Sequence, residues 1–340
     1  MNRSVCSAKA QHCGGCPLLE LPYPEQLQQK ETLVRSLLGK FSAPLPILGM
    51  EQPVYYRNKA IATFTSVHGR LVYGLYEEGS HRVVPFQNCL LLDRRLNEIL
   101  HAILETAVRC RLTAYDEDRR SGLLRHVVLR RGHDTGECSV TLVTPSSFFP
   151  GSREFVRSLR AACPDVVTIV QNINPRKTSA VLGSQEKILF GKGFITDQLC
   201  GKKFDIGSRA FYQINPVQTE RLYRTALEFA ALRGNERVID AYCGIGTIGL
   251  IAADQAKEVL GVELNSEAVR NAGRNARKNK TKNARFLHAD AGELMNQMAK
   301  SGERADLVFL DPPREGASEQ FLSALLRLSP PRVVYISCNP

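Results

Sequence analysis

Apolar residues follow a helical period near the start of the chain and shorter, strand-like patterns through its middle. The leucines of residues 24–41 fall on one face of a predicted amphipathic helix, which Gly39 helps to end. Beyond it, β-branched or alternating runs bounded by Gly, Asn or Pro predict strands at 60–67, 71–76, 123–131, 139–144 and 166–173. The first part of the chain is therefore expected to be rich in β-structure.

From residue 201 the pattern becomes a regular alternation of strands and helices. Asn215 and Pro216 are typical of a helix start, and Gly234 of the stop after a helix running to 233. Strands are predicted at 237–241, 258–262, 284–288, 306–310 and 332–337, with helices at 247–255, 266–278, 292–298 and 318–328. Such βαβ units form a parallel α/β sheet that binds ligands beyond the carboxyl ends of its strands.

Composition divides the chain into three expected parts. Residues 1–22 hold three cysteines, two adjacent glycines and two prolines, which is typical of an irregular loop without a core of its own. We expect this loop, together with Cys89, to form a metal-binding segment, followed by a β-rich α+β domain at 23–200 and a parallel α/β domain at 201–340.

The 340 residues carry a net charge of +11, which favours a polyanionic partner such as nucleic acid, although a merely solvated surface is the alternative. No apolar run approaches the roughly 18 residues of a membrane span, and no signal peptide is evident. A monomeric cytoplasmic protein without membrane contact is expected. Because no export signal is present, the ten cysteines point to metal or catalytic roles rather than disulfides.

A glycine-rich turn follows the strand at 237–241. Gly244, Gly246 and Gly249 have the spacing of a dinucleotide fingerprint, and Glu263 lies where the ribose-binding acid is expected. The ends of four predicted strands, however, carry carboxylates: Asp240, Glu263, Asp290 and Asp311. Four converging carboxylates would repel a pyrophosphate but suit a ligand with a sulfonium, an ammonium and ribose hydroxyls, which describes S-adenosylmethionine. Simple packing of the turn is the alternative for the glycines, and core packing for Tyr242.

Cys338 follows the last predicted strand and is a candidate nucleophile, with a buried structural thiol as the alternative. The neighbouring strand ends in Asp311-Pro312-Pro313-Arg314, a rigid loop whose arginine argues against methylation of exocyclic amino groups. Carbon 5 of uracil is too poor a nucleophile to accept a methyl group directly. A thiolate that adds to carbon 6 first would activate it.

These motifs resemble those of the RNA uridine C5-methyltransferases. The resemblance rests on Phe211-Tyr-Gln213-Ile-Asn215, Asp240-Ala-Tyr-Cys-Gly244, Val262-Glu263, Asp311-Pro-Pro-Arg314 and Ser337-Cys338-Asn339-Pro340, with Tyr56-Arg57-Asn58-Lys59-Ala60 and Gly74-Leu75-Tyr76 in the middle of the chain. It implies a Rossmann-like methyltransferase domain and Cys338 as the nucleophile. It also implies that S-adenosylmethionine is contacted by Gln213, Tyr242, Glu263 and Asp311, with Asp290 addressing the adenine.

Cys6, Cys13, Cys16 and Cys89 form a possible four-thiolate site, for which spacing alone allows zinc or an iron–sulfur cluster. The resemblance implies a [4Fe–4S] cluster and 23S ribosomal RNA as the substrate, because the tRNA-directed branch generally lacks these cysteines. For RNA contact we expect members of an arginine group, although residues at alternate strand positions point to opposite sides: Arg109, Arg111, Arg119, Arg120, Arg125, Arg130 and Arg131.

The sequence departs from the family pattern near its end. Five strands are predicted where seven are usual, and the family's general base, a glutamate downstream of the cysteine, has no counterpart. We therefore expect a domain truncated at its C-terminal strands. The alternatives are a tRNA uridine C5-methyltransferase, an RNA-binding iron–sulfur protein with an inactive transferase domain, and an NAD-linked oxidoreductase that rests on the glycines alone.

Overall fold

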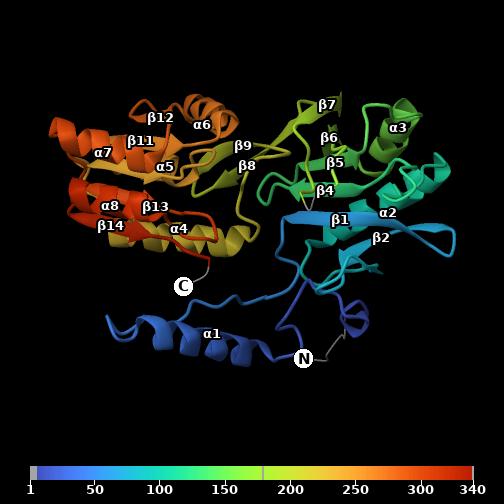
Figure 1. Ribbon diagram of the computed structural model, residues 1–340, viewed down its shortest axis with the longest axis horizontal. Coiled ribbons are helices and arrows are strands. Elements are labelled where there is room, and N and C mark those ends of the chain that lie inside the picture. The colour runs from blue at the N-terminus through green and yellow to red at the C-terminus, as the bar shows by residue number, and fades with distance from the viewer. Residues whose placement is uncertain (1–5, 178–179, 339–340) are drawn as a thin grey trace. The chain divides into compact units, whose positions relative to one another are not determined.

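The computed structural model describes residues 6–177 and 180–338 and divides into two compact units (Figure 1). Unit 1 comprises Met1–Ile195 with Gly207–Arg209, and unit 2 comprises Thr196–Ile206 with Ala210–Pro340. Among the described residues, no helix combines the length and apolar character that crossing a membrane requires.

A seven-stranded sheet forms the centre of unit 1, in the order β3-β2-β1-β4-β5-β6-β7. Its strands are β1 (Lys59–Val67), β2 (Arg70–Tyr76), β3 (Val83–Pro85), β4 (His126–Arg131), β5 (Cys138–Thr144), β6 (Val166–Ile173) and β7 (Gln185–Phe190). The pair β5 and β6 is parallel, while the other neighbours run antiparallel. This mixed sheet agrees with the β-rich character expected of the first part of the chain.

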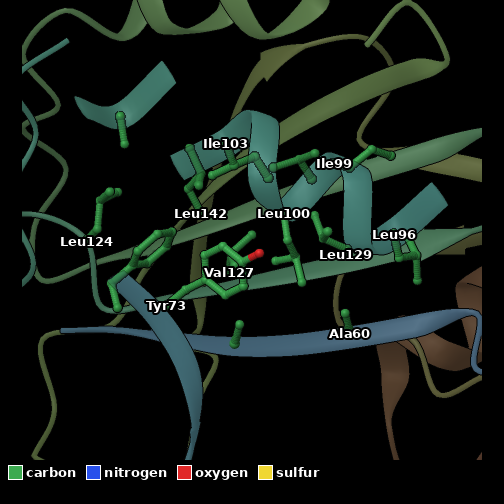
Figure 2. Close-up of a cluster of buried hydrophobic side chains, with 14 of the residues drawn as sticks. Ala60, Tyr73, Leu96, Ile99, Leu100, Ile103, Leu124, Val127, Leu129 and Leu142 are labelled. Atoms are coloured by element: carbon green, nitrogen blue, oxygen red, sulfur yellow. The ribbon is translucent and has the colours of Figure 1, made fainter. Parts of the chain in front are cut away.

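Two helices, α2 (Arg94–Arg109) and α3 (Ser152–Ala162), pack with this sheet. Asp93 begins α2 by accepting a hydrogen bond from the Arg95 N–H, and apolar residues at every third or fourth position then face the strands. Figure 2 shows Leu96, Ile103 and their neighbours from α2 against side chains of the sheet. These side chains have no solvent exposure and form the centre of the unit's core.

The N-terminal segment contains the short helix η1 (Lys9–Gln11) and the helix α1 (Tyr23–Leu38), which has no buried residue. The loop around η1 does have a core contact, contrary to the expectation from its composition. Ala8 and Cys13 belong to the core cluster of unit 1, and Cys13 forms a bridge with Glu77 after β2. The loop therefore folds onto the edge of the sheet, a contact that its own sequence could not indicate.

The main sheet of unit 2 has five strands, all parallel, in the order β12-β11-β10-β13-β14. Their bounds are β10 (Arg237–Ala241), β11 (Glu258–Glu263), β12 (Ala284–His288), β13 (Leu307–Leu310) and β14 (Arg332–Tyr335). The hairpin of β8 (Phe194–Leu199) and β9 (Lys202–Gly207) and the helix α4 (Pro216–Ala230) precede this sheet. The predicted parallel α/β architecture is confirmed.

The remaining helices are α5 (Thr247–Ala252), α6 (Ser266–Lys278), α7 (Ala291–Ser301) and α8 (Glu319–Leu328). Ile239 and Ala241 of β10 pack in one core cluster with residues of α7 and α8, whereas Asp240 between them accepts a hydrogen bond from Gly249 of α5. Because alternate residues of a strand point to opposite faces, α5 covers one face of the sheet, and α7 and α8 cover the other.

Candidate active site

The order of the strands locates the site. From β10 the chain proceeds outward to β11 and β12, then returns to β13 on the other side of β10 and continues to β14. In sheets of this kind, ligands bind at the carboxyl ends of the strands where the order reverses, here between β10 and β13. Asp240 near the end of β10 and Asp311 just after β13 flank this point.

Asp240 is a fully buried carboxyl group beneath the glycine-rich turn. Its Oδ2 atom accepts a hydrogen bond of 2.8 Å from the Gly249 N–H in the first turn of α5. Burial raises the pKa of Asp240 to about 7, an effect to which the carboxylates of Asp311 and Glu263 add and which the Gly249 hydrogen bond opposes. A Cβ at Gly249 would lie 2.8 Å from the same oxygen, so this close approach requires glycine.

The turn from β10 to α5 relies on left-handed backbone conformations. Tyr242, Gly244 and Gly246 all have positive φ, of 62°, 55° and 83° respectively. The Gly246 N–H closes the turn by donating to the Cys243 carbonyl oxygen, at 2.8 Å. The turn is thus held in a tight, hydrogen-bonded conformation at the carboxyl ends of the strands.

Glu263, the last residue of β11, is held by two backbone donors. Its Oε2 accepts from the Gly244 N–H at 3.1 Å and its Oε1 from the Asn265 N–H at 2.8 Å. Both carboxylate oxygens are thereby oriented, while each keeps acceptor capacity for another donor. A partly exposed carboxylate in this arrangement can accept hydrogen bonds from a pair of vicinal hydroxyls.

Asp311 and Gln213 come together across almost one hundred residues of sequence. The Gln213 Nε2 donates to the Asp311 Oδ2 at 3.4 Å. Burial raises the pKa of Asp311 to about 6, although the amide of Gln213 opposes the shift. Tyr223 of α4 is buried nearby, and its hydroxyl lies 3.4 Å from the Thr247 Oγ1. Sequence patterns did not single out Tyr223 or Thr247, since one is an ordinary apolar-face residue of a helix and the other follows the glycine turn.

Tyr242 and Asp290 occupy the same edge of the sheet. The Tyr242 ring packs against Phe321 of α8, with ring centroids 5.2 Å apart, and remains partly exposed. Asp290 caps α7, because its Oδ1 accepts a hydrogen bond of 2.9 Å from the Glu293 N–H. This capping fixes the orientation of Asp290 and leaves its second carboxylate oxygen for other partners.

Cys338 lies just beyond β14 and is exposed. The Ile336 N–H donates to the Leu310 carbonyl oxygen at 2.9 Å, which continues the pairing with β13 one residue past the end of β14. Cys338 therefore follows on the same carboxyl edge that carries Asp311. Residues 339–340 of the predicted motif lie outside the described residues.

The four cysteines of the predicted cluster converge in unit 1. Burial, together with the nearby Cys89, Cys13 and Cys6, raises the pKa of the Cys16 thiol to about 11. Nevertheless, within residues 6–177 and 180–338, no three His, Cys, Asp or Glu side chains are arranged to hold a metal ion. The predicted metal site is therefore not supported. Cys13 belongs to the apolar core instead, and Cys6 and Cys89 pack against it.

The predicted arginine group is only partly available to RNA. Arg125 and Arg130 are buried, with 4% and 3% exposure. Arg125 is also occupied by the Asn174 and Arg176 carbonyl oxygens and by the Glu117 carboxylate. These two arginines therefore cannot form part of an RNA surface, in line with the expectation that only some members of the group reach it, because their side chains are buried. Four members of the group are exposed: Arg109, Arg111, Arg119 and Arg120.

Comparisons with known proteins agree with this geometry. Residues 232–340 match the family described as a methyltransferase domain. A protein of Halalkalibacterium halodurans named as an RNA methyltransferase is 43% identical over 333 residues, which cover 96% of this chain and 73% of that protein. A protein of Bacillus cereus with the same description is 40% identical over 333 residues, with the same coverage of both chains.

A solved structure resembles nearly the whole chain. It is the Pyrococcus abyssi tRNA (uracil-54, C5)-methyltransferase in complex with S-adenosyl-L-homocysteine, with a TM-score of 0.81 and 26% sequence identity. The match covers 97% of this chain and 77% of that protein.

Proposed function

This chain belongs to the RNA methyltransferase family, and from that premise we propose that it methylates carbon 5 of a uridine in RNA with S-adenosylmethionine as the methyl donor. Unit 2 has the fold of S-adenosylmethionine-dependent methyltransferases. The observation that carries the proposal is the position of Cys338, which follows β14 on the edge where β13 ends in Asp311. Methylation of an amino group needs no thiol at this position, whereas methylation of carbon 5 of uracil requires a nucleophile that adds to carbon 6.

The carboxylates and the turn fit S-adenosylmethionine. When bound, this cofactor supplies an electrophilic methyl group on a sulfonium. Glu263 would accept hydrogen bonds from the ribose hydroxyls, and Asp311 with Gln213 would bind the cationic amino acid end. Tyr242 and Asp290 would contact the adenine side, and Gly244 and Gly246 allow the close approach of the turn. The raised pKa of Asp311 fits this role, because a cation returns the group to its charged form.

Cys338 would act as the nucleophile toward the uracil ring. A bond forms between its Sγ and carbon 6, and the electron pair of the C5–C6 double bond moves onto carbon 5 and the neighbouring carbonyl. Carbon 5 would then bond to the methyl carbon of the sulfonium, while the bond between that carbon and sulfur breaks and its electron pair stays on sulfur as a neutral thioether. Removal of the proton on carbon 5 by a base restores the double bond and expels the thiolate, so the cysteine is regenerated.

For the RNA, we propose a uridine of 23S ribosomal RNA, on the basis of the Cys6, Cys13, Cys16 and Cys89 pattern in the sequence. A [4Fe–4S] cluster on these residues would need a rearrangement of the four side chains, and no step above depends on it. A transfer RNA is the second candidate, because the structurally similar Pyrococcus abyssi enzyme acts on tRNA.

Methyl transfer to the two RNAs tests this proposal. The protein is incubated with methyl-labelled S-adenosylmethionine and unmodified 23S transcript or unmodified tRNA, and the labelled nucleoside is identified by mass spectrometry. We expect 5-methyluridine from the 23S transcript. Label on an adenine or guanine would contradict the reaction, whereas 5-methyluridine from tRNA alone would retain the reaction and replace the substrate.

A further inference from the structure

A concentration of positive charge lies in unit 2, along α6 and the turn into β12. Between residues 266 and 285 the sequence has seven basic residues and one acidic residue. Six of the basic residues form what we call the α6 stripe, all of them exposed: Arg270, Arg274, Arg277, Lys280, Lys282 and Arg285.

Helical spacing places three arginines on one side of α6. Arg270, Arg274 and Arg277 are separated by four and three positions, so they project from one face over about 10 Å of the helix axis. The opposite side of α6 is buried through Asn271, Ala272, Asn275 and Ala276. Packing of the buried side explains why positions 270, 274 and 277 face solvent. It does not explain why arginine occupies all three positions.

Ion pairing within the protein does not account for the α6 stripe. In the described part of the chain none of its six residues forms a salt bridge, whereas the adjacent Lys278 pairs with Asp205. Arg270 and Arg274 donate only to neutral groups, the Ser266 hydroxyl and the Asn271 carbonyl oxygen. Three arginines on other helices differ, since Arg35, Arg157 and Arg224 each pair with a glutamate one turn away.

The stripe leads to a hollow at the amino ends of the strands. This hollow has a volume of about 360 Å³, and its lining includes Lys257, Lys282, Arg285 and Arg304. Its two carboxylates, Glu258 and Glu303, both pair with Arg237. The other four cations thus have no carboxylate partner among the described residues, and the hollow is a site of net positive charge.

The other end of the stripe approaches the candidate active site. Glu263 orients the Asn265 N–H, and Asn265 in turn caps α6 at its first residues. α6 lies beside the terminal strand β12 and runs antiparallel to the strands (Figure 1). Its cations therefore extend from the carboxyl ends of the strands, where the candidate active site lies, toward their amino ends. A polyanion bound along α6 would be directed toward the edge that carries the reacting groups.

We propose that the α6 stripe and the cationic hollow bind the phosphate backbone of the RNA substrate outside the methylation site. The charge of the surface decides the partner, because a row of exposed arginines and lysines without carboxylates matches a phosphodiester chain. The contact is with phosphates and is independent of the base sequence. The inference rests on the proposed function only in taking RNA as the substrate.

Salt-dependent RNA binding tests the proposal. The probe is a fluorescein-labelled single-stranded oligouridylate of 20 nucleotides, whose Kd is measured between 50 and 200 mM KCl. The triple variant R270A/R274A/R277A should reduce the slope of log Kd against log salt by about 2, since each lost phosphate contact on a single strand removes about 0.7. Variant K282A/R304A at the hollow should reduce it by about 1.4.

A matched control is the triple variant R35A/R157A/R224A, which also removes three exposed helical arginines and the same total charge. Its slope should stay close to that of the unmodified protein. Equal reductions in both triple variants would overturn the proposal, because net charge alone would then explain binding. An unchanged slope in R270A/R274A/R277A would also overturn it. Aggregation of this variant would overturn it as well, because the charges would then serve to protect the edge strand β12.

The affinity of R270A/R274A/R277A for S-adenosylmethionine reports whether unit 2 is folded. It should equal that of the unmodified protein. This readout separates the inference from the proposed function. A reduced salt slope in a protein that transfers no methyl group would retain the stripe and contradict the activity. Methyl transfer by R270A/R274A/R277A with an unchanged salt slope would contradict the role of the α6 stripe and retain the proposed activity.

Discussion

At the scale of single residues, the turn after β10 has backbone conformations that most side chains avoid. Tyr242 adopts a φ of 62° without being glycine, which costs about 1–2 kcal/mol of folding free energy. The Tyr242 ring packs against Phe321 of α8. Such strain is typical of positions where a ligand determines the backbone, which agrees with a role for this turn in binding the cofactor.

Replacing Gly246 with Ala should destabilise the protein and weaken cofactor binding. The residue has a φ of 83°, and an added Cβ would lie 2.9 Å from two carbons of the Phe286 ring. We expect a loss of about 2–4 kcal/mol in the free energy of unfolding, from the strained φ together with the overpacking. Urea denaturation measures the loss, and calorimetry measures the affinity for S-adenosylmethionine.

Gly302→Ala is the matched control, because Gly302 has a φ of 76° but nothing within 4 Å of an added Cβ. It should cost only the conformational part, about 1–2 kcal/mol, and leave the affinity unchanged. Equal losses in the two variants would contradict the close contact between Gly246 and Phe286.

The affinity for S-adenosylmethionine should fall as the pH decreases from 7.5 to 5. Burial holds the pKa of Asp311 at about 6 and that of Asp240 at about 7, so both become neutral over this range and attract a cation less. Asp311→Asn should weaken binding at pH 7.5 and reduce the pH dependence. The exposed Asp254, which pairs with Lys202, provides a control in Asp254→Asn, which should bind as the unmodified protein does. An affinity independent of pH in the unmodified protein would argue against Asp311 as a cofactor ligand.

At the scale of elements, the parallel half of the chain was predictable because most of its helix starts have a local signal. Asn215, Asn265, Asp290 and Ser318 all cap helices with their side chains, and the strands between are short apolar runs. The strands at 237–241 and 284–288 were predicted with their observed bounds. The bounds of the other predicted elements differ by at most three residues, but the strand β9 was not predicted.

Elements of unit 1 depend more on partners distant in sequence. The strand predicted at 123–131 begins only at His126, because the N–H groups of Leu123 and Leu124 donate to the Thr113 carbonyl oxygen instead. The edge strand β7 was not predicted, since its first four residues are exposed and lack an alternating pattern. Its pairing with β6 creates the strand, and no local signal in the sequence reports that pairing.

The start of α2 should depend on Asn97, a buried residue of that helix. Its Oδ1 accepts from the Cys89 N–H at 2.8 Å, and its Nδ2 donates to the Cys89 carbonyl oxygen at 3.1 Å. We expect Asn97→Ala to lower the free energy of unfolding by about 2–3 kcal/mol, because it leaves buried backbone groups of Cys89 without partners. Urea denaturation measures this loss.

The neighbouring exposed Asn88, whose amide donates to the Tyr55 hydroxyl, provides the comparison. Asn88→Ala should change stability by no more than about 0.5 kcal/mol. If Asn97→Ala were equally mild, the link between α2 and the segment that contains Cys89 would not be important for stability.

At the scale of the whole molecule, the net charge of +11 indicated a polyanionic partner, but the total could not show which cations are free. Arg125 is occupied by carbonyl groups some fifty residues away in sequence, whereas Arg274 and Arg277 are exposed without an acidic partner in the described part of the chain. Likewise, the motifs indicated the candidate site residues, but their convergence depends on the strand order, which brings β13 beside β10.

The central claim, that Cys338 bonds to a pyrimidine ring of the RNA, is tested most directly by covalent trapping. RNA with 5-fluorouridine in place of uridine should form a complex that survives denaturing electrophoresis, because fluorine cannot leave carbon 5 as a proton and elimination stalls. Cys338→Ser should abolish the complex, since a serine hydroxyl is far less nucleophilic than a cysteine thiol. Cys200→Ser, which alters a half-exposed thiol of the β8–β9 turn, should trap RNA normally. Equal trapping by Cys338→Ser and the unmodified protein would contradict the account.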